Sequence, residues 1–353
     1  MDKKSIVDLF VPGRLCLFGE HSDWAGGHRR QNSGIAIGQA IVAPTNQGNY
    51  AIVRELDKPI LDFNSYKTLG TYERMPLEEK ELLKIAQDGG LFSYVAGVAY
   101  EIVTSYHQNG RGIYIENYKT NLPIQRGLSS SASVCVLTAK AFNELWDLNW
   151  KTRRIMEVAY LGETTTPSRC GRMDQACAYD KPILMTFDGD KVDVEELKIR
   201  RDFYLLIADL KAGKDTKKIL TDLNKGFPFP TTTEEKRKHE YFNEVNPKMI
   251  GFAKLALAHG EPECLGQNMS IAQKEFDNYL APSCSELTAP KLHQVLNFSK
   301  IQDYIHGGKG VGSGGDGTAQ FVCKSKEDRE KAKIFLEEEL KLECFDLDLK
   351  KNI

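Results

Sequence analysis

A glycine and serine cluster directly before a helical pattern is the feature that most constrains this chain. Residues 126–135 read Arg-Gly-Leu-Ser-Ser-Ser-Ala-Ser-Val-Cys, and the apolar run 134–145 has the spacing of a buried helix. Small residues at a helix start let a ligand approach N–H groups that lack partners within the helix, and the helix dipole favours anions there. The cluster therefore predicts a phosphate-binding turn or, alternatively, an ordinary serine cap in a loop.

The length of the chain predicts two domains. It has 353 residues, more than one typical domain holds, and the charged stretch 188–201 precedes an apolar strand pattern. We therefore expect an N-terminal domain over residues 1–200 and a C-terminal domain over residues 201–353.

Apolar runs alternate with helical patterns along the chain, which indicates a mixed α and β fold. The expected strands lie at 15–18, 35–43, 50–53, 113–115, 183–187, 202–209 and 319–323. The expected helices lie at 91–106, 131–146, 151–162, 234–258, 265–280, 286–298 and 324–341. A polar, Lys-rich loop is expected over residues 211–236.

Charge and hydropathy argue against several classes of function. The 47 Lys and Arg residues against 49 Asp and Glu residues give a formal charge of −2, which provides no polybasic field for nucleic acid. No apolar run reaches membrane-spanning length, and no apolar stretch typical of a signal peptide follows the first residues. We expect a cytoplasmic protein that binds neither nucleic acid nor a membrane and works as a monomer or homodimer. Its eight scattered cysteines have no Cys-x-x-Cys spacing and are expected to be reduced packing residues.

Polar residues crowd beside a short apolar strand near the N-terminus. Glu20, His21 and Asp23 stand in a turn flanked by glycines. Carboxylates accept hydrogen bonds and imidazole can donate or accept, so such a turn suits the binding of neighbouring hydroxyls. The alternatives are a capping or core role for the histidine and a metal site, although the close spacing fits no known metal-ligand motif.

Two carboxylates stand in the segment 162–175. Glu163 closes a helical pattern, and Asp174 follows a glycine-containing turn. Magnesium takes one or two protein carboxylates together with substrate phosphates, which leaves the other carboxylate to orient or deprotonate a hydroxyl. Alternatively, Asp174 caps the helical run that follows it.

A third cluster is the glycine-rich segment 307–317. Gly310, Gly312 and Gly315 satisfy the dinucleotide pattern Gly-x-Gly-x-x-Gly, so an oxidoreductase has to be considered. That pattern should follow a strand and open a helix, whereas this segment runs into the strand expected at 319–323. Close approach of the backbone to a ligand explains the number of glycines better than a flexible turn does.

Together these motifs resemble the GHMP kinase superfamily, which includes galactokinase, homoserine kinase, mevalonate kinase and phosphomevalonate kinase. Residues 12–23 look like the galactokinase signature, and the resemblance is closest to galactokinase-like sugar 1-kinases. Residues 127–132 look like the family phosphate loop, 170–175 like the segment with the galactokinase catalytic aspartate, and 310–317 like the third motif. The resemblance implies an α+β fold of two domains. The N-terminal domain would be like the second domain of ribosomal protein S5, and the C-terminal domain would be ferredoxin-like.

The resemblance also assigns roles to individual residues. Asp174 would be the base or hydroxyl-orienting group, and Arg14 would stabilise the reacting oxygens. Ser131 and Glu163 would hold magnesium. The nucleotide phosphates would lie against Gly127, Leu128, Ser129, Ser130, Ser131 and Ala132. The substrate would be bound by Glu20, His21, Asp23, Gly312, Ser313 and Gly314.

These roles imply a kinase that uses ATP and Mg²⁺ to phosphorylate the anomeric hydroxyl of a galactose-like monosaccharide. The alternatives are a mevalonate-type small-alcohol kinase and a non-catalytic sensor of ATP and sugar. The chain departs from the galactokinase pattern in the segment expected to bind the sugar. There, Ser22-Asp-Trp-Ala25 replaces the Thr-Asp-Tyr-Asn of galactokinases and is followed by Arg29 and Arg30. An arginine there would pair with the carboxylate of a uronic acid, whereas a solvated face is the other role for both arginines.

Overall fold

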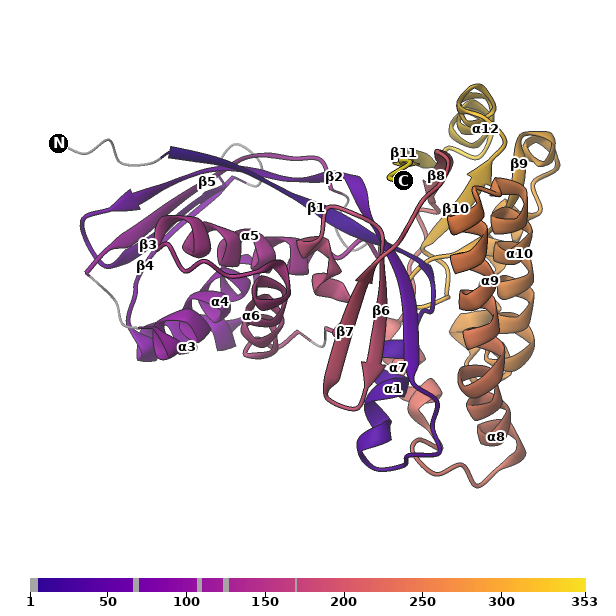
Figure 1. Ribbon diagram of the computed structural model, residues 1–353, viewed down its shortest axis with the longest axis horizontal. Coiled ribbons are helices and arrows are strands. Elements are labelled where there is room, and N and C mark those ends of the chain that lie inside the picture. The colour runs from indigo at the N-terminus through magenta and orange to yellow at the C-terminus, as the bar shows by residue number, and fades with distance from the viewer. Residues whose placement is uncertain (1–5, 66–69, 107–109, 123–126, 169) are drawn as a thin grey trace. The chain divides into compact units, whose positions relative to one another are not determined.

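The computed structural model describes residues 6–65, 70–106, 110–122, 127–168 and 170–353 (Figure 1). Contacts divide the chain into two compact units, of residues 1–14 with 44–180 and of residues 15–43 with 181–353. The strands β1 (Ile6–Phe18) and β2 (Gly38–Leu56) pass from one unit into the other. The units therefore do not follow the expected boundary at residue 200, and the domains 1–200 and 201–353 stay a prediction.

The first unit is built on a mixed sheet. β2 pairs antiparallel with β5 (Gly112–Thr120), which runs parallel to β3 (Ile60–Ser65), and β3 pairs antiparallel with β4 (Thr71–Pro76). Side chains alternate along β2, where Ala51 and Val53 are fully buried while Ile52 is exposed. This period of two gives the sheet one face that helices can cover.

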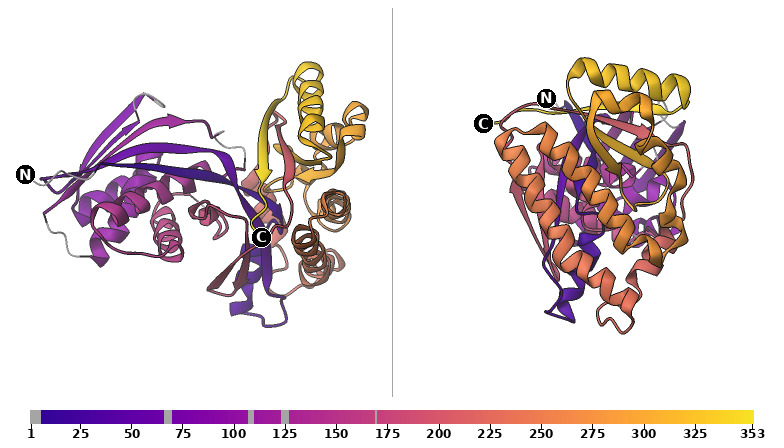
Figure 2. Two further views of the ribbon diagram at one scale, coloured as in Figure 1. Left: turned by 45° about the horizontal axis from the view of Figure 1, so that its top comes forward. Right: turned by 90° about the vertical axis from the view of Figure 1, so that its right-hand side faces the viewer.

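Helices cover one face of this sheet (Figures 1 and 2). They are α3 (Glu79–Asp88), α4 (Leu91–Ser105), α5 (Ser130–Leu145) and α6 (Thr152–Thr164). α4 and α6 cross closely, because a Cβ atom on Gly97 would lie 2.2 Å from the carbonyl oxygen of Gly162. The helices expected at 91–106, 131–146 and 151–162 are confirmed, and the crossing fixes the backbone next to Glu163.

The second unit contains a four-stranded antiparallel sheet in the order β11-β8-β10-β9. Its strands are β8 (Phe203–Asp209), β9 (Ile305–Gly310), β10 (Thr318–Cys323) and β11 (Glu343–Leu349). Helices connect the first of these strands to the second and the third to the fourth, which is the ferredoxin-like β-α-β-β-α-β arrangement. The expectation of a ferredoxin-like fold in this part of the chain is confirmed.

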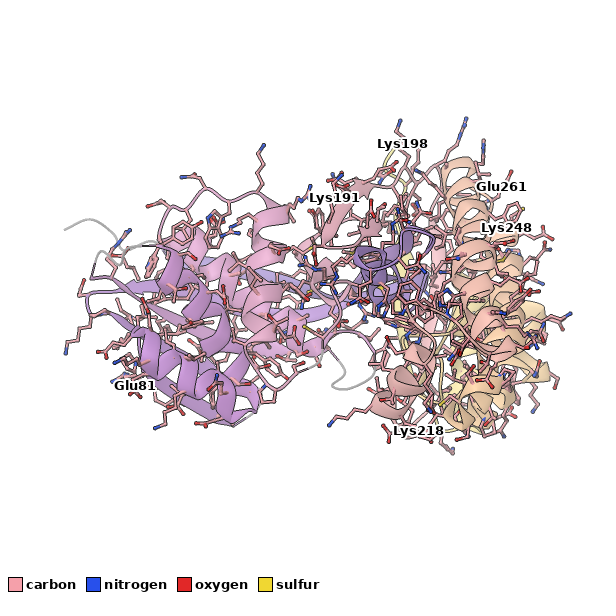
Figure 3. The ribbon with its side chains drawn as sticks, turned by 90° about the horizontal axis from the view of Figure 1, so that it is seen from below. Glu81, Lys191, Lys198, Lys218, Lys248 and Glu261 are labelled. Carbon is pink, nitrogen blue, oxygen red and sulfur yellow. The ribbon has the colours of Figure 1, made fainter. Side chains whose placement is uncertain are left out.

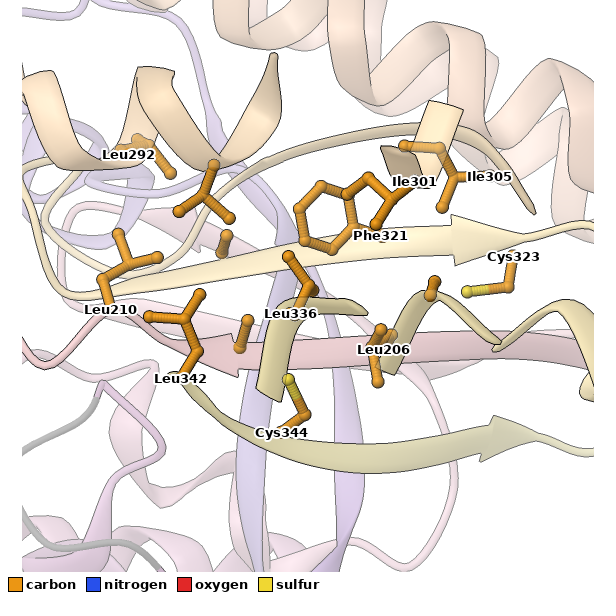
Figure 4. Packing of buried hydrophobic residues seen from close by; sticks show 14 of the residues in the cluster. Leu206, Leu210, Leu292, Ile301, Ile305, Phe321, Cys323, Leu336, Leu342 and Cys344 are labelled. Atoms are coloured by element: carbon orange, nitrogen blue, oxygen red, sulfur yellow. The ribbon is translucent and has the colours of Figure 1, made fainter. Parts of the chain in front are cut away.

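The ferredoxin-like sheet is covered by helices of the same unit. α9 (Asn246–His259) and α10 (Pro262–Tyr279) run side by side, and α10 packs along β9 (Figures 1 and 2). α12 (Lys326–Glu339) packs on β8 and β11. The apolar core beneath it includes Leu206, Phe321 and Leu336 (Figure 4).

A second part of this unit positions the polar turn after β1. The first residues of β2 pair with β6 (Ile183–Asp188), which forms a hairpin with β7 (Lys191–Glu196). α1 (Ser22–Gly27) packs on β6 so closely that a Cβ atom on Gly26 would lie 2.5 Å from the carbonyl oxygen of Phe187. A glycine is therefore required where the turn after β1 meets the hairpin.

One expectation about local structure was wrong. The segment 211–236 is not one loop, because it contains α7 (Thr216–Asn224) and the start of α8 (Thr233–Glu240). The Asp215 side chain caps α7 by accepting from the N–H of Lys218, and Ile219 and Leu223 give the helix a buried face. The glycine-rich segment 307–317 begins inside β9, so only its later part is a loop.

The surface carries charged side chains of both signs, among them Glu81, Lys191 and Lys248 (Figure 3). All eight cysteines are free, and Cys264 alone among them is exposed. In the part of the chain that the structure describes, no helix is both long and apolar enough to cross a membrane.

Candidate active site

Asp174 lies in a cluster of polar groups in the first unit. Its Oδ1 atom accepts a hydrogen bond from the hydroxyl of Ser129 at 2.6 Å and forms an ion pair with the guanidinium of Arg14. Its Oδ2 atom accepts from the backbone N–H of Gly171 at 3.2 Å. The side chain keeps 24% of its surface exposed, so a ligand can reach it. Asp174 begins a short 3₁₀ helix, but its carboxylate bonds to the preceding turn rather than capping that helix.

Arg14 is held by β1 and by the glycine and serine loop. Its backbone N–H donates to the carbonyl of Leu128 at 3.1 Å, and its Nη1 donates to the carbonyl of Gly127 at 2.9 Å. A Cβ atom on Gly13 would lie 2.7 Å from the Leu128 carbonyl oxygen, so only glycine lets the strand approach the loop this closely. These contacts bring the expected catalytic residues Arg14 and Asp174 together with the expected phosphate loop.

The loop turns into α5 at Ser129. This residue has a φ of 58° and a ψ of 52°, in the left-handed region that residues other than glycine seldom adopt. A serine at this position usually caps the helix by accepting from a first-turn N–H, but the Ser129 hydroxyl makes no such bond and donates to Asp174 instead. The first-turn N–H groups at Ser130, Ser131 and Ala132 are therefore left uncapped by Ser129, as anion binding requires.

Glu163 is completely buried at the end of α6. Its carboxylate accepts hydrogen bonds from Gln175 at 2.7 Å and from Ser168 at 3.3 Å, and it also interacts with the Ser131 hydroxyl. Burial, and after it the negative charge of Asp174, raises the pKa of Glu163 to about 7. A bound cation would favour the ionised carboxylate and offset this cost.

The donor atoms around Glu163 suit magnesium. A carboxylate and a hydroxyl are hard oxygen ligands, and Mg²⁺ usually takes few protein ligands alongside water and phosphate oxygens. Among the described residues, no three His, Cys, Asp or Glu side chains gather into a metal site. Ser131 and Glu163 therefore fit a magnesium ion that a nucleotide would help to hold.

Glu20 lies in the second unit, in the turn between β1 and α1. Its carboxylate forms an ion pair with Nζ of Lys309 on β9, and Nζ also donates to the carbonyl of Gly310 at 2.8 Å. The Glu20 and Lys309 side chains are only 9% and 7% exposed. A small pocket beside the pair is lined by Phe18, Tyr241, Asn246, Gln273, Phe276 and Gly314 among others. The sequence analysis did not predict a role for Lys309. The signal that could have found it is a charged residue inside a glycine-rich segment.

His21 connects two of the expected substrate-binding motifs. Its Nδ1 accepts from the indole N–H of Trp24 at 3.0 Å, and its Nε2 lies 3.1 Å from the carbonyl oxygen of Ser313. An indole N–H can only donate, so the ring proton is assigned to Nε2, which donates to Ser313. Burial lowers the pKa of His21, which favours this neutral form. Both ring nitrogens therefore already have partners, and His21 holds the third motif against the turn after β1.

The other expected substrate residues also lie in the second unit. Gly312 and Gly314 have φ values of 75° and 85°, and a Cβ atom on Gly314 would lie 2.3 Å from the ring of Phe276. The buried hydroxyl of Ser313 has no hydrogen-bond partner within the described ranges, which is unfavourable unless a ligand supplies one. Asp23 is half-buried in the first turn of α1.

Arg29 and Arg30 are paired with carboxylates near the β6–β7 hairpin. Arg29 bonds Asp188 at 2.6 Å, and Arg30 bonds Asp190 at 2.9 Å. Both pairs are partly exposed, so this surface role agrees with the solvated face considered above. Arg126 and Arg169, which stand in the quoted motifs, lie outside the described residues.

Comparison with known proteins finds one matching family model and several relatives. Residues 93–181, which include the expected phosphate loop, Glu163 and Asp174, match the model of the GHMP kinases N terminal domain. The resemblance to the GHMP kinase superfamily is confirmed. Among its GHMP kinase relatives, the galactokinase of Clostridium acetobutylicum is 32% identical over 170 residues. That match covers 47% of this chain and 40% of the relative, which is less than two thirds of the relative's length.

Two longer matches extend over most of the chain. The galactokinase of Thermosipho africanus is 26% identical over 350 residues, which cover 89% of this chain and 88% of that protein. The crystal structure of Lactococcus lactis galactokinase complexed with galactose is 16% identical, with a TM-score of 0.72 over 99% of this chain and 95% of that one. The structural likeness shows the GHMP kinase fold, and the predicted α+β architecture of two domains is confirmed.

Proposed function

We propose that this GHMP kinase is an ATP-dependent phosphotransferase that acts on an alcohol group, and that the alcohol is the anomeric hydroxyl of a galactose-like monosaccharide. One observation carries the proposal. The hydroxyl of Ser129, at the start of α5, donates to Asp174, which also pairs with Arg14. Ser129 therefore does not cap the first-turn N–H groups of α5, which would bind an anion. A phosphate site beside a partly exposed carboxylate and a guanidinium suits phosphoryl transfer, which depends on positioning and electrostatic stabilisation.

The residues of the first unit would act on the nucleotide and on the reacting hydroxyl. The backbone N–H groups at the start of α5 would bind phosphate oxygens. Asp174 would orient the hydroxyl and accept its proton. Arg14 is fixed by Gly127 and would stabilise the negative charge of the transferred group.

Magnesium is part of the proposal. Ser131 and Glu163 would hold the ion, since they offer a hydroxyl and a buried carboxylate that interact with each other. When bound, the ion would neutralise charge on the phosphate oxygens.

The residues of the second unit would bind the sugar. Glu20, Asp23 and the Ser313 hydroxyl are polar groups suited to sugar hydroxyls. We favour a neutral sugar over a uronic acid because Arg29, Arg30 and Lys309 are each already paired with a carboxylate of the same unit. An acidic sugar that used one of these three cations would have to break its ion pair.

The test is ADP release with Mg²⁺ and ATP over a panel of neutral monosaccharides, galacturonate, glucuronate and mevalonate. We expect turnover with a galactose-like sugar, and a product whose phosphate is released by mild acid, as an anomeric phosphate is. Turnover with mevalonate alone would establish the small-alcohol kinase, and preference for a uronate would overturn the neutral-sugar assignment. Binding of ATP and sugar without turnover would point to the sensor.

A further inference from the structure

A buried ion pair lies beside the pocket of the second unit and is not used in the chemistry above. Glu20 and Lys309 are 289 positions apart in the sequence, yet their side chains meet in the interior at the wall of this pocket. Buried Lys and Glu side chains are rare unless they are paired. The pair joins the turn after β1, which carries the expected sugar residues, to the strand that leads into the third glycine motif.

Lys309 is the cation that balances Glu20. His21 and Tyr241 also interact electrostatically with Glu20. Burial lowers the pKa of His21, and the bond from Trp24 occupies Nδ1, so the imidazole stays neutral. Burial raises the pKa of the Tyr241 phenol, which carries no positive charge in either form. Of these three interacting groups, Lys309 therefore supplies the positive charge.

The second bond made by Lys309 restricts where its ammonium can lie. An ammonium has three N–H donors, of which one serves Glu20 and another serves the carbonyl of Gly310. Because Gly310 follows Lys309 directly in β9, this bond ties the charge to the backbone of the third motif. The Glu20 carboxylate is thus held in one place by a cation that is itself held by backbone.

We propose that Lys309 is a specificity-determining positioning residue. It holds the Glu20 carboxylate in one position as a hydrogen-bond acceptor for a hydroxyl of a neutral sugar. This inference rests on the proposed function, because it takes a sugar as the ligand of Glu20. Without Lys309, the carboxylate is left buried without its ion-pair partner, and it then turns away from this position.

The test compares Lys309→Met, Glu20→Gln and the double variant with the wild type. We expect Lys309→Met to weaken galactose-like sugar binding about tenfold or more, measured by calorimetry and as KM. The kcat and the KM for ATP should change by less than about threefold, because the nucleotide residues lie in the first unit. Lys300→Met is the matched control, since it breaks the exposed Lys300–Glu339 pair of the same unit and should leave sugar binding unchanged.

Thermal unfolding of the same proteins provides an independent readout. The double variant should be more stable than Lys309→Met alone, because it leaves no unpaired charge in the interior. If Lys309→Met fails to fold while the double variant folds, the result also supports the view that Lys309 balances the charge of Glu20. Sugar binding that Lys309→Met leaves within twofold of the wild type, or an equal loss of ATP binding, would overturn this inference alone. Wild-type protein that binds no sugar would overturn both this inference and the proposed function.

Discussion

The two units treat the charges of their site residues in different ways. In the first unit, the Asp174 carboxylate pairs with the guanidinium of Arg14, Glu163 is buried near the negative charge of Asp174, and the start of α5 is left uncapped by Ser129. In the second unit, Glu20 is matched by Lys309, and both nitrogens of His21 are occupied. The first arrangement leaves interactions for a cation and an anion, whereas in the second arrangement Glu20 and His21 already have protein partners that fix their positions.

This difference predicts where substitutions will act. Removing a group from the first unit takes away an interaction with the reacting atoms, so the turnover number should fall. Removing a group from the second unit releases a partner inside the protein, so sugar affinity and stability should change instead.

The largest effect is expected for Asp174→Ala. If Asp174 orients and deprotonates the hydroxyl, kcat should fall by about a thousandfold or more, while ATP and sugar affinities change only a few-fold. Steady-state kinetics and calorimetry measure the two quantities. Asp180→Ala, at a nearby exposed position, is the control and should keep wild-type kcat. If the Asp174→Ala enzyme kept more than a tenth of wild-type kcat, Asp174 would not act on the reacting hydroxyl, and the proposed difference between the two units would be wrong.

A smaller effect is expected for Glu163→Gln. The loss of a buried carboxylate ligand should raise the Mg²⁺ concentration needed for half-maximal activity by about 10- to 100-fold. Titration of Mg²⁺ at fixed ATP measures this, and removal of the metal by a chelator should abolish turnover of the wild type. Glu157→Gln on the same helix breaks an ion pair with Arg172 and should leave the Mg²⁺ titration unchanged. An unaltered titration for Glu163→Gln would show that Glu163 does not hold the metal.

Two helix glycines test whether packing supports the site of the first unit. Alanine at Gly97 would clash with Gly162, beside Glu163, and should cost about 1–3 kcal/mol of unfolding free energy. Alanine at Gly251 in α9 of the second unit would meet nothing within 4 Å and should add about 0.5–1 kcal/mol. Urea unfolding measures both. Gly97→Ala should also weaken Mg²⁺ binding, and equal stability of the two variants would contradict the helix crossing.

The parts of this molecule that sequence could predict are those with local signals. The helix periodicity at 131–146 reports a buried face, and the glycines and serines before it report a backbone that must approach a ligand. The partner of Glu20 could not be predicted, because an ion pair across 289 positions leaves no local pattern. The helix at 216–224 was missed because its polar, Lys-rich composition is also typical of a loop, and its cap at Asp215 depends on a single side chain.

The last prediction concerns pH and tests whether the His21 imidazole is held neutral inside the second unit. Burial holds the pKa of His21 below the value of about 6.5 in the unfolded chain. Between these two pKa values the unfolded chain binds more protons than the folded one, so stability falls as the pH drops through 6.5 and levels off below the folded pKa. His21 should contribute up to about 1.4 kcal/mol per pH unit to this slope. Urea unfolding from pH 8 to 5 should therefore give a shallower pH dependence for His21→Asn than for the wild type.

The remaining histidines set the control for this measurement. Burial also lowers the pKa values of His239 and His306, so part of the slope should persist in His21→Asn. His259 is exposed, and His259→Asn is the matched control for replacing a histidine by asparagine. A slope unchanged by His21→Asn would mean that the imidazole titrates as freely in the folded protein as in the unfolded chain. The assignment of a buried, neutral imidazole to His21 would then be wrong.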